Sequence, residues 1–113
     1  MISDTTTAAL EHALKAVALR QRTAAHNIAN AATPGFRSQR VDFEQQLSSA
    51  LDRGGPLEAA ILTRPAATPI SINGNDVLLE EESTILLESE IRYEALIAGL
   101  NHKLGLIRSA IGS

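Results

Sequence analysis

The residues that could perform chemistry are few, and their spacing assembles no active site. The three histidines, His12, His26 and His102, do not share a helical turn, and none has the glutamate-flanked spacing of a zinc protease. Gly54-Gly55 lacks the lysine and the following helix of a phosphate-binding loop. The 113-residue chain contains no cysteine, so thiolate chemistry and disulfides are excluded. We therefore expect no enzyme activity, no metal and no cofactor.

Charged side chains give no clearer sign of a ligand site. In the middle of the chain, only Asp52, Glu58 and Asp76 could supply a titratable cleft. The net charge is -3, which argues against electrostatic binding of nucleic acid. We expect no small-molecule substrate either. Four arginines have acidic neighbours: Arg20, Arg22, Arg37 and Arg40. A solvated face or salt bridges between subunits explain them better than nucleic-acid binding does.

Two long helices, over residues 3–32 and 79–111, are predicted to carry the chain. Each has one seam of mostly apolar residues spaced alternately by four and three, which is typical of helices that pack on other helices. Ser3 or Asp4 is expected to cap the first helix. The seam of the first helix is Leu10, Leu14, Val17, Gln21, Ala24, Ile28 and Ala31, and that of the second is Leu86, Glu90, Tyr93, Ile97, Leu100, Leu104, Ile107 and Ile111.

Two features of the second helix need an explanation. Glu80, Glu81 and Glu82 fall in its first turns, where negative charge complements the helix dipole, so we interpret them as dipole partners and not as metal ligands. Gly99 and Gly105 each cost roughly 1 kcal/mol against alanine inside a helix. They indicate either a close approach of another helix or a helix that stays soft until it is packed.

The first helix must end near Pro34, because proline disfavours the helical conformation in the residue before it. Pro34-Gly35 is typical of the centre of a type II turn, in which glycine adopts positive φ. Asn27 and Asn30 share a face of the last helical turn and are expected to tie down the turn or the terminal carbonyl groups.

The middle segment, residues 33–78, is predicted to be mostly irregular. Phe43 and Leu47 favour a short amphipathic helix through about Leu51, and Asp52–Pro56 breaks it. One helical turn at 57–62 and a small hairpin around Asn73-Gly74, pairing 70–72 with Val77, are further expectations. The predicted fold is all-α: one domain, 1–113, built as an antiparallel, coiled-coil-like hairpin of the two terminal helices. Two helices leave apolar surface uncovered, so an isolated subunit should be partly disordered.

The stretch N-I-A-N-x-x-T-P-G-F, which closes the first helix, resembles the signature of the flagellar basal-body rod and hook protein family. Its residues here are Asn27, Ile28, Ala29, Asn30, Thr33, Pro34, Gly35 and Phe36. The block from Glu90 to Ala95 and the residues that follow resemble the closing helix of a proximal rod subunit of that family. Only about 45 residues separate the helices, whereas hook and distal-rod subunits carry large inserted domains there.

The resemblance implies a structural axial subunit of the proximal rod, exported without a cleaved signal peptide and spanning the periplasm. Its partners would be itself and other rod subunits, with the membrane ring and the export gate at the rod base. Phe43 followed by Leu47 resembles an export-gate recognition element. The N-terminus has no basic and apolar regions of a signal peptide, and no stretch is apolar enough to span a membrane. Residues expected to carry assembly are Leu10, Leu14, Val17, Ile28, Tyr93, Ile97, Leu100, Leu104 and Ile107. A soluble helical adaptor or chaperone-like binding module is the alternative.

Overall fold

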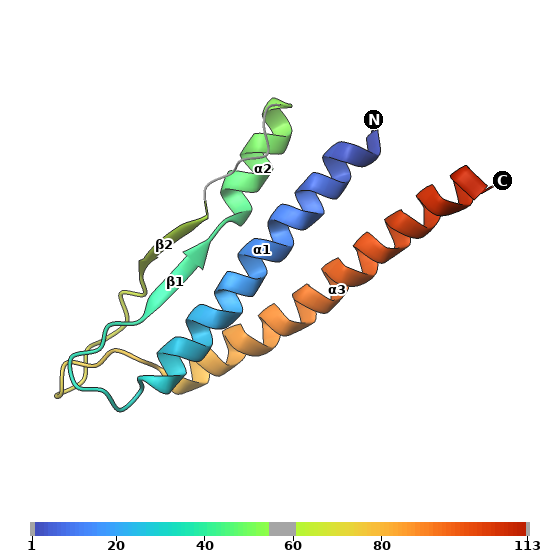
Figure 1. Ribbon diagram of the computed structural model, residues 1–113. Coiled ribbons are helices and arrows are strands. Elements are labelled where there is room, and N and C mark those ends of the chain that lie inside the picture. Colours follow the sequence, from blue (N-terminus) through green and yellow to red (C-terminus); the bar gives the residue numbers. More distant parts are fainter. Residues whose placement is uncertain (1, 55–60, 113) are drawn as a thin grey trace.

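The computed structural model describes residues 2–54 and 61–112, which form a thin, elongated molecule of 64 × 26 × 14 Å (Figure 1). Its two long helices run antiparallel, and both chain ends lie at the same end of the molecule. A short arm of strands and a small helix lies along α1, on the side away from α3. In chain order the elements are α1 (Ile2–Ala29), β1 (Gln39–Asp42), α2 (Glu44–Arg53), β2 (Leu62–Pro65) and α3 (Leu79–Gly112).

The predicted pair of long terminal helices is confirmed, with small differences at their ends. α1 begins at Ile2, so Ser3 and Asp4 lie inside its first turn and not before it as predicted. It ends at Ala29 instead of residue 32, because from Asn30 onward the backbone amides bond three residues back: Ala31 N–H donates to the Ile28 carbonyl at 3.1 Å. The helix has therefore tightened into turns before the proline is reached.

The small sheet lies elsewhere than expected. β1 and β2 pair antiparallel, with Val41 opposite Thr63, whereas the predicted hairpin at 70–77 has no strands. Asn73-Gly74 does form a tight turn, with Gly74 at φ +82°. The flanking Ile72 is fully exposed, so no apolar surface favours a strand there, while Val41 is buried. Most of the helical turn predicted at 57–62 lies outside the described residues, and Leu62 belongs to β2.

The apolar core is small and rich in alanine. It comprises Ala13, Ala16 and Val17 of α1 with Phe43, and the partly buried Leu47, Ile61, Tyr93 and Leu96 pack against it. Phe43 and Leu47 thus lie at the start of α2 and rest on α1, as the sequence predicted for a short amphipathic helix. Alanine buries little area, so this core contributes less hydrophobic stabilisation than a core of larger side chains would.

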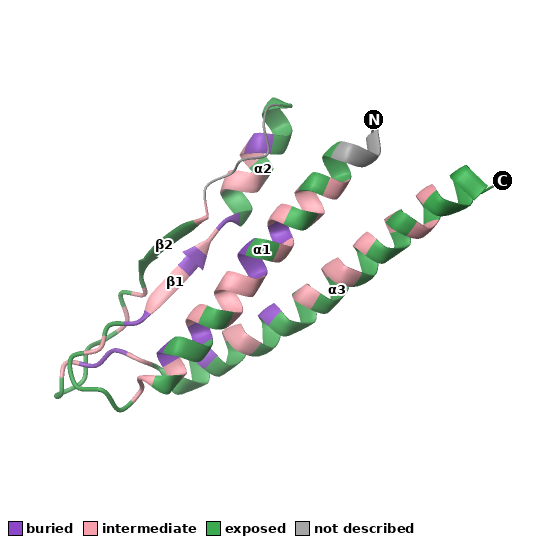
Figure 2. Ribbon diagram, in the orientation of Figure 1, coloured by how far each residue is buried: buried purple, intermediate pink, exposed green. Residues whose placement is uncertain are grey.

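The buried faces of both long helices, coloured in Figure 2, overlap the predicted seams only in part. On α3 the buried residues are Glu82 and Ser89, whereas Glu90 is exposed and Leu104 is 45 % exposed. On α1 the most buried residues are Ala16, Val17, Ala24 and Asn27. Small and polar side chains occupy the contact because α1 is covered from two sides, by α3 and by the arm. Of the residues expected to carry assembly, Val17 is buried; Leu10, Leu14, Ile28, Tyr93, Ile97, Leu100 and Ile107 are half-buried.

The two interior glycines of α3 face open space. A Cβ built on Gly99 or Gly105 would meet nothing within 4 Å. Within the subunit, therefore, no neighbouring helix requires a glycine at either position. Close approach by another helix therefore does not hold inside one chain, and the prediction of a helix that stays soft until it is packed stays a prediction.

Candidate functional site

The turn after α1 is held by its own backbone and by Asn30. Phe36 N–H donates to the Thr33 carbonyl at 3.2 Å, which closes a turn with Gly35 at φ +75°. The side-chain amide of Asn30 donates to the His26 carbonyl at 2.9 Å, satisfying a terminal carbonyl of the helix. The Thr33 hydroxyl donates to Asn30 Oδ1 at 3.1 Å. The ring of Phe36 meets His26 edge-on, with centroids 5.6 Å apart.

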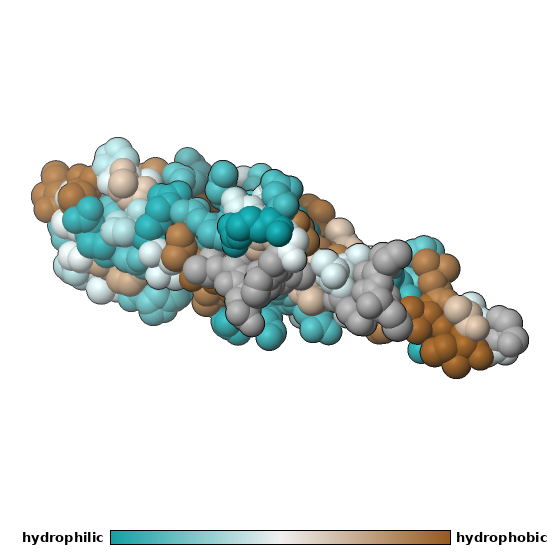
Figure 3. All heavy atoms as spheres, turned by 90° about the horizontal axis from the view of Figure 1, so that it is seen from above, coloured by the Kyte–Doolittle hydropathy of each residue, from teal (hydrophilic) through white to brown (hydrophobic). Residues whose placement is uncertain are grey.

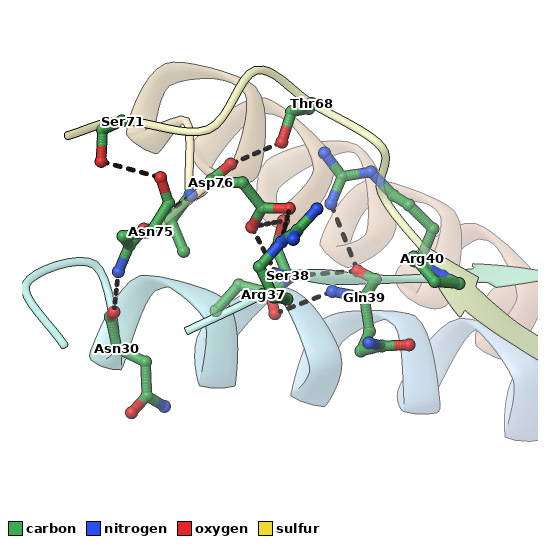
Figure 4. A network of polar contacts seen from close by, with 12 residues as sticks. Asn30, Arg37, Ser38, Gln39, Arg40, Thr68, Ser71, Asn75 and Asp76 are labelled. Atoms are coloured by element: carbon green, nitrogen blue, oxygen red, sulfur yellow. Dashed lines mark hydrogen bonds and ion pairs between the residues drawn. The ribbon is translucent and has the colours of Figure 1, made fainter. Parts of the chain in front are cut away.

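A second turn, just before α3, is hydrogen-bonded to the first (Figure 4). Gly35 N–H donates to the Asn73 carbonyl at 2.8 Å. The buried side-chain amide of Asn75 donates to the carbonyls of Asn30 at 2.9 Å and Thr33 at 2.7 Å. Asn75 Oδ1 in turn accepts from Val77 N–H at 2.8 Å. One asparagine therefore adds a second hydrogen bond to each of two carbonyls in the turn after α1.

Asp76 continues the connection toward β1. Its buried carboxylate accepts from the backbone N–H of Ser38 at 2.6 Å, from the Ser38 hydroxyl at 2.9 Å and from Arg37 Nε at 3.1 Å. Burial opposes the charged form, but the Ser38 hydrogen bonds and the Arg37 guanidinium outweigh it and lower the pKa of Asp76. The ionised carboxylate thus holds the start of β1 against the start of α3.

Asn27 and Glu82 join α1, β1 and α3 at a buried point. Asn27 bonds both backbone groups of Gln39: its Nδ2 donates to the carbonyl at 3.0 Å, and its Oδ1 accepts from the N–H at 3.3 Å. The same Nδ2 donates to Glu82 Oε2 at 3.0 Å. Arg40 donates to Glu82 and, at 2.7 Å, to Glu81. Because Asn27 and Glu82 are fully buried, these bonds offset the cost of removing both side chains from water.

A third junction links α1, α2 and α3 through Glu44. Arg20 binds the Glu44 carboxylate with two hydrogen bonds, at 2.6 and 2.8 Å, and Arg92 donates to it at 3.0 Å. Arg20 also donates to the Val41 carbonyl and lies over the Phe43 ring, 4.9 Å from its centre. The hydrogen bonds from Arg20 lower the pKa of Glu44 to about 2. A bidentate pair of this kind fixes the angle between the elements it joins.

Sequence reasoning identified the first turn but missed its partners. Asn75 and Asp76 are separated from the turn by about forty residues, and no local pattern shows that contact. The acidic run, residues 80–82, does lie in the first turn of α3, as predicted. Glu82 is in addition buried and forms a salt bridge with Arg40. The prediction that the arginines form a solvated face or bridge subunits was wrong for Arg20, Arg37 and Arg40, which pair within the chain.

The charged groups of this region are occupied by one another. A cavity of about 200 Å³ between α1, β1 and α3 is lined by Arg20, Arg40 and Glu82, all engaged in the pairs above, and by Ser89 and Arg92. Among residues 2–54 and 61–112, no group of three or more potential metal ligands comes together. The arrangement holds backbone segments in place. This arrangement and the long, thin shape together define the class of the protein: an elongated, helical, structural protein.

Comparison with known proteins agrees with this class. The sequence profile described as "Flagella basal body rod protein" matches residues 9–37, which include most of α1 and the turn after it. The chain is 32 % identical to the flagellar basal body rod protein FlgB of Cereibacter sphaeroides, over 75 % of this chain and 77 % of that protein. It is 29 % identical to FlgB of Escherichia coli K12 over 83 % of each chain, and 25 % identical to FlgB of Bacillus subtilis 168 over 90 % and 89 %.

The chain belongs to the flagellar basal body rod protein family, and within that family it is FlgB-like. The resemblance seen in the sequence is thereby confirmed. The protein has a structural role in the flagellar basal body and is not an enzyme. None of the helices in the described part of the chain is both long and apolar enough to cross a membrane.

Proposed function

We propose that this protein is an axial subunit of the proximal rod, and that residues 1–113 form a single rod-type domain. The terminal helices of neighbouring copies and of other rod subunits pack into a tube that crosses the periplasm. The tube passes motor torque outward and surrounds an export channel. At its base it meets the membrane ring and the export gate, with Phe43 and Leu47 as the candidate gate-recognition element.

The observation that carries this proposal is the turn after α1 and its fixed attachment to the base of α3. Turn residues of the matched profile region, Asn30, Thr33 and Gly35, are each bonded by Asn73 or Asn75. Asn27 fixes β1 and α3 to the same end of α1. A subunit that transmits torque must keep its helices at a constant angle, and bonds between three elements at one end of the hairpin supply that constraint.

Exposed apolar side chains on α3 supply surface for packing with neighbours. Leu87 and Ile91 are each 59 % exposed. Toward the C-terminal end, Leu104, Leu106 and Ile111 are exposed as well, and Figure 3 shows apolar atoms gathered at that tip of the molecule. Contiguous exposed apolar surface is typical of sites of protein association. Leu10, Leu14, Val17, Ile28, Tyr93, Ile97, Leu100, Leu104 and Ile107 remain the residues proposed to carry helix packing.

The test is complementation of a non-motile strain of the native bacterium from which this gene is deleted. The unaltered chain should restore motility and appear in isolated basal bodies. Gly35→Val should abolish both, because a β-branched residue resists the positive φ of the turn. Gly54→Val is the matched control, since Gly54 also has positive φ, +62°, with open space around it, but lies at the end of α2. Equal loss with both variants, or rescue by Gly35→Val, would contradict the role of the turn.

A further inference from the structure

α1 presents a second seam to solvent, on the side away from its core contacts. Six residues spaced alternately by four and three form it, and we call them the outer α1 seam: Glu11, Lys15, Ala18, Arg22, Ala25 and Ala29. Five of the six are exposed and Ala18 is half-buried. Three are alanines, which let another helix come close. Next to the seam, Arg22, His26 and Thr63 line a groove of about 380 Å³.

α3 carries an equivalent outer seam with different chemistry. We define the outer α3 seam as Glu80, Thr84, Leu87, Ile91, Glu94 and Ala98, again spaced by four and three, and all six residues are exposed. The inner seam of the same helix, which includes Glu82, Ser89 and Tyr93, faces α1 of its own chain. A helix with heptad spacing on two opposite faces is built to pack between two partners.

The charges of the two outer seams are complementary. Lys15 and Arg22 lie seven residues apart on α1, and no ion pair within the described part of the chain engages either of them. The outer α3 seam carries Glu80 and Glu94, with Glu90 beside it, which likewise have no ion pair there. Glu11 is the one acidic residue of the outer α1 seam. Complementary charge at the edges of an apolar contact sets the choice of partner.

We propose that the outer α3 seam of one copy packs against the outer α1 seam of a second copy of this chain. An antiparallel contact with Leu87 over Ala29 and Ile91 over Ala25 would set Arg22 opposite Glu94. This inference rests on the proposed function as a rod subunit and names the surfaces that join its copies. The two seams are different patches on one molecule, so the contact is heterologous and extends from copy to copy without closing a dimer.

The arrangement inside one subunit supports this choice of partner. α1 and α3 already pack antiparallel within the chain through small and polar residues. An α3 from a second copy, placed on the outer α1 seam that neither α3 nor the arm of the same subunit covers, repeats the same kind of helix pair. Successive copies then form a continuous layer in which α1 and α3 alternate. The second copy also covers Leu87 and Ile91, which are the large apolar residues of the outer α3 seam.

Disulfide crosslinking tests the contact directly, because the natural chain contains no cysteine. Ala25→Cys marks the outer α1 seam. Ile91→Cys marks the outer α3 seam at the position that faces Ala25 in this register. Pairs of single-cysteine chains are produced together in the deletion strain and oxidised in intact cells. We expect Ala25→Cys to crosslink with Ile91→Cys several-fold more than with Ser48→Cys, an exposed site on α2, while motility is retained.

Charge reversal supplies an independent readout. Arg22→Glu should reduce the α1–α3 crosslink about tenfold, because it places like charges across the contact. Adding Glu94→Arg in the same chain should restore it, whereas Arg53→Glu on α2 should have no effect. If cells are motile but copies crosslink no more than the Ser48→Cys control, or the seams crosslink only to another protein, the inference is overturned and the proposed function stands. Failure of the unaltered chain to restore motility would overturn both.

Discussion

Gly35 and Gly74 pack backbone against backbone: a Cβ added to Gly74 would lie 3.2 Å from the Cα of Gly35. The two glycines belong to turns at the end of α1 and just before α3, and both have positive φ. A side chain on Gly74 would crowd the backbone of Gly35, whereas one on Gly35 would meet open space. The turn that identifies the family is therefore shaped by a second turn almost forty residues further along the chain.

This contact predicts that Gly74→Ala is more costly than an equivalent change elsewhere. Positive φ and the contact with Gly35 should together lower the free energy of unfolding by about 2–3 kcal/mol. Gly54→Ala carries the strain of positive φ without a neighbour within 4 Å, so it should cost about 1 kcal/mol. Urea unfolding followed by circular dichroism measures both. Equal costs would show that the turns are not in contact.

Removing the Asn27 side-chain amide should destabilise the fold more than removing that of Asn30. Asn27→Ala removes two hydrogen bonds to the backbone of Gln39 and one to the buried Glu82 carboxylate, which should cost about 2–3 kcal/mol. Asn30→Ala removes a more exposed bond to the His26 carbonyl and should cost at most about 1 kcal/mol. The same unfolding assay compares them. A larger effect from Asn30 would refute the ranking drawn from burial.

Stability should fall in acid because of Glu44. Its pKa in the folded protein is about 2, against an ordinary value of 4.5, so the stabilisation from Arg20 is complete above pH 4.5. It is lost as the pH falls from 4.5 toward 2, and the lowered pKa of Asp76 acts in the same direction. Glu44→Gln should be less stable than the unaltered protein at neutral pH, and the difference between their free energies of unfolding should shrink as the pH falls through this interval. In Arg20→Gln, the pKa of Glu44, followed by nuclear magnetic resonance, should rise toward 4.5; a pKa that stays near 2 would remove Arg20 as the cause.

Replacing both interior glycines of α3 should make the isolated chain more helical. Gly99→Ala with Gly105→Ala meets no neighbouring atom and gains about 1 kcal/mol per residue in helix propensity. Circular dichroism should show a higher melting temperature for the double variant. If that stabilised chain also assembles normally, the glycines are not close contacts between subunits. A block in assembly alone would indicate that a neighbour approaches them.

The local parts of this fold were predictable because their causes are local. Heptad spacing marked both long helices, and Pro34-Gly35 marked the turn between α1 and β1. The contacts between distant segments were not predictable from one sequence: Asn27 and Glu82 are 55 residues apart, and each is a common surface residue type. The buried face of α1 was predicted only in part: Val17 and Ala24 are buried as expected, but Ala13, Ala16 and Asn27 were missing from the predicted seam because the hydropathy of alanine and asparagine barely distinguishes inside from outside. β1 and β2 have four residues each, so their pattern is too short to be recognised in the sequence.

The junction at one end of the hairpin also implies a gradient of order along the molecule. The hydrogen bonds described above tie α3 to the rest of the chain at Glu81, Glu82 and Arg92, in its first half. Leu104, Leu106 and Ile111, in its second half, remain exposed. Local opening should therefore begin at the chain ends, so amide hydrogens there should exchange with solvent fastest. In the proposed rod, an arriving subunit would therefore have one end ordered in advance, while the other end would become ordered after contact with its neighbours.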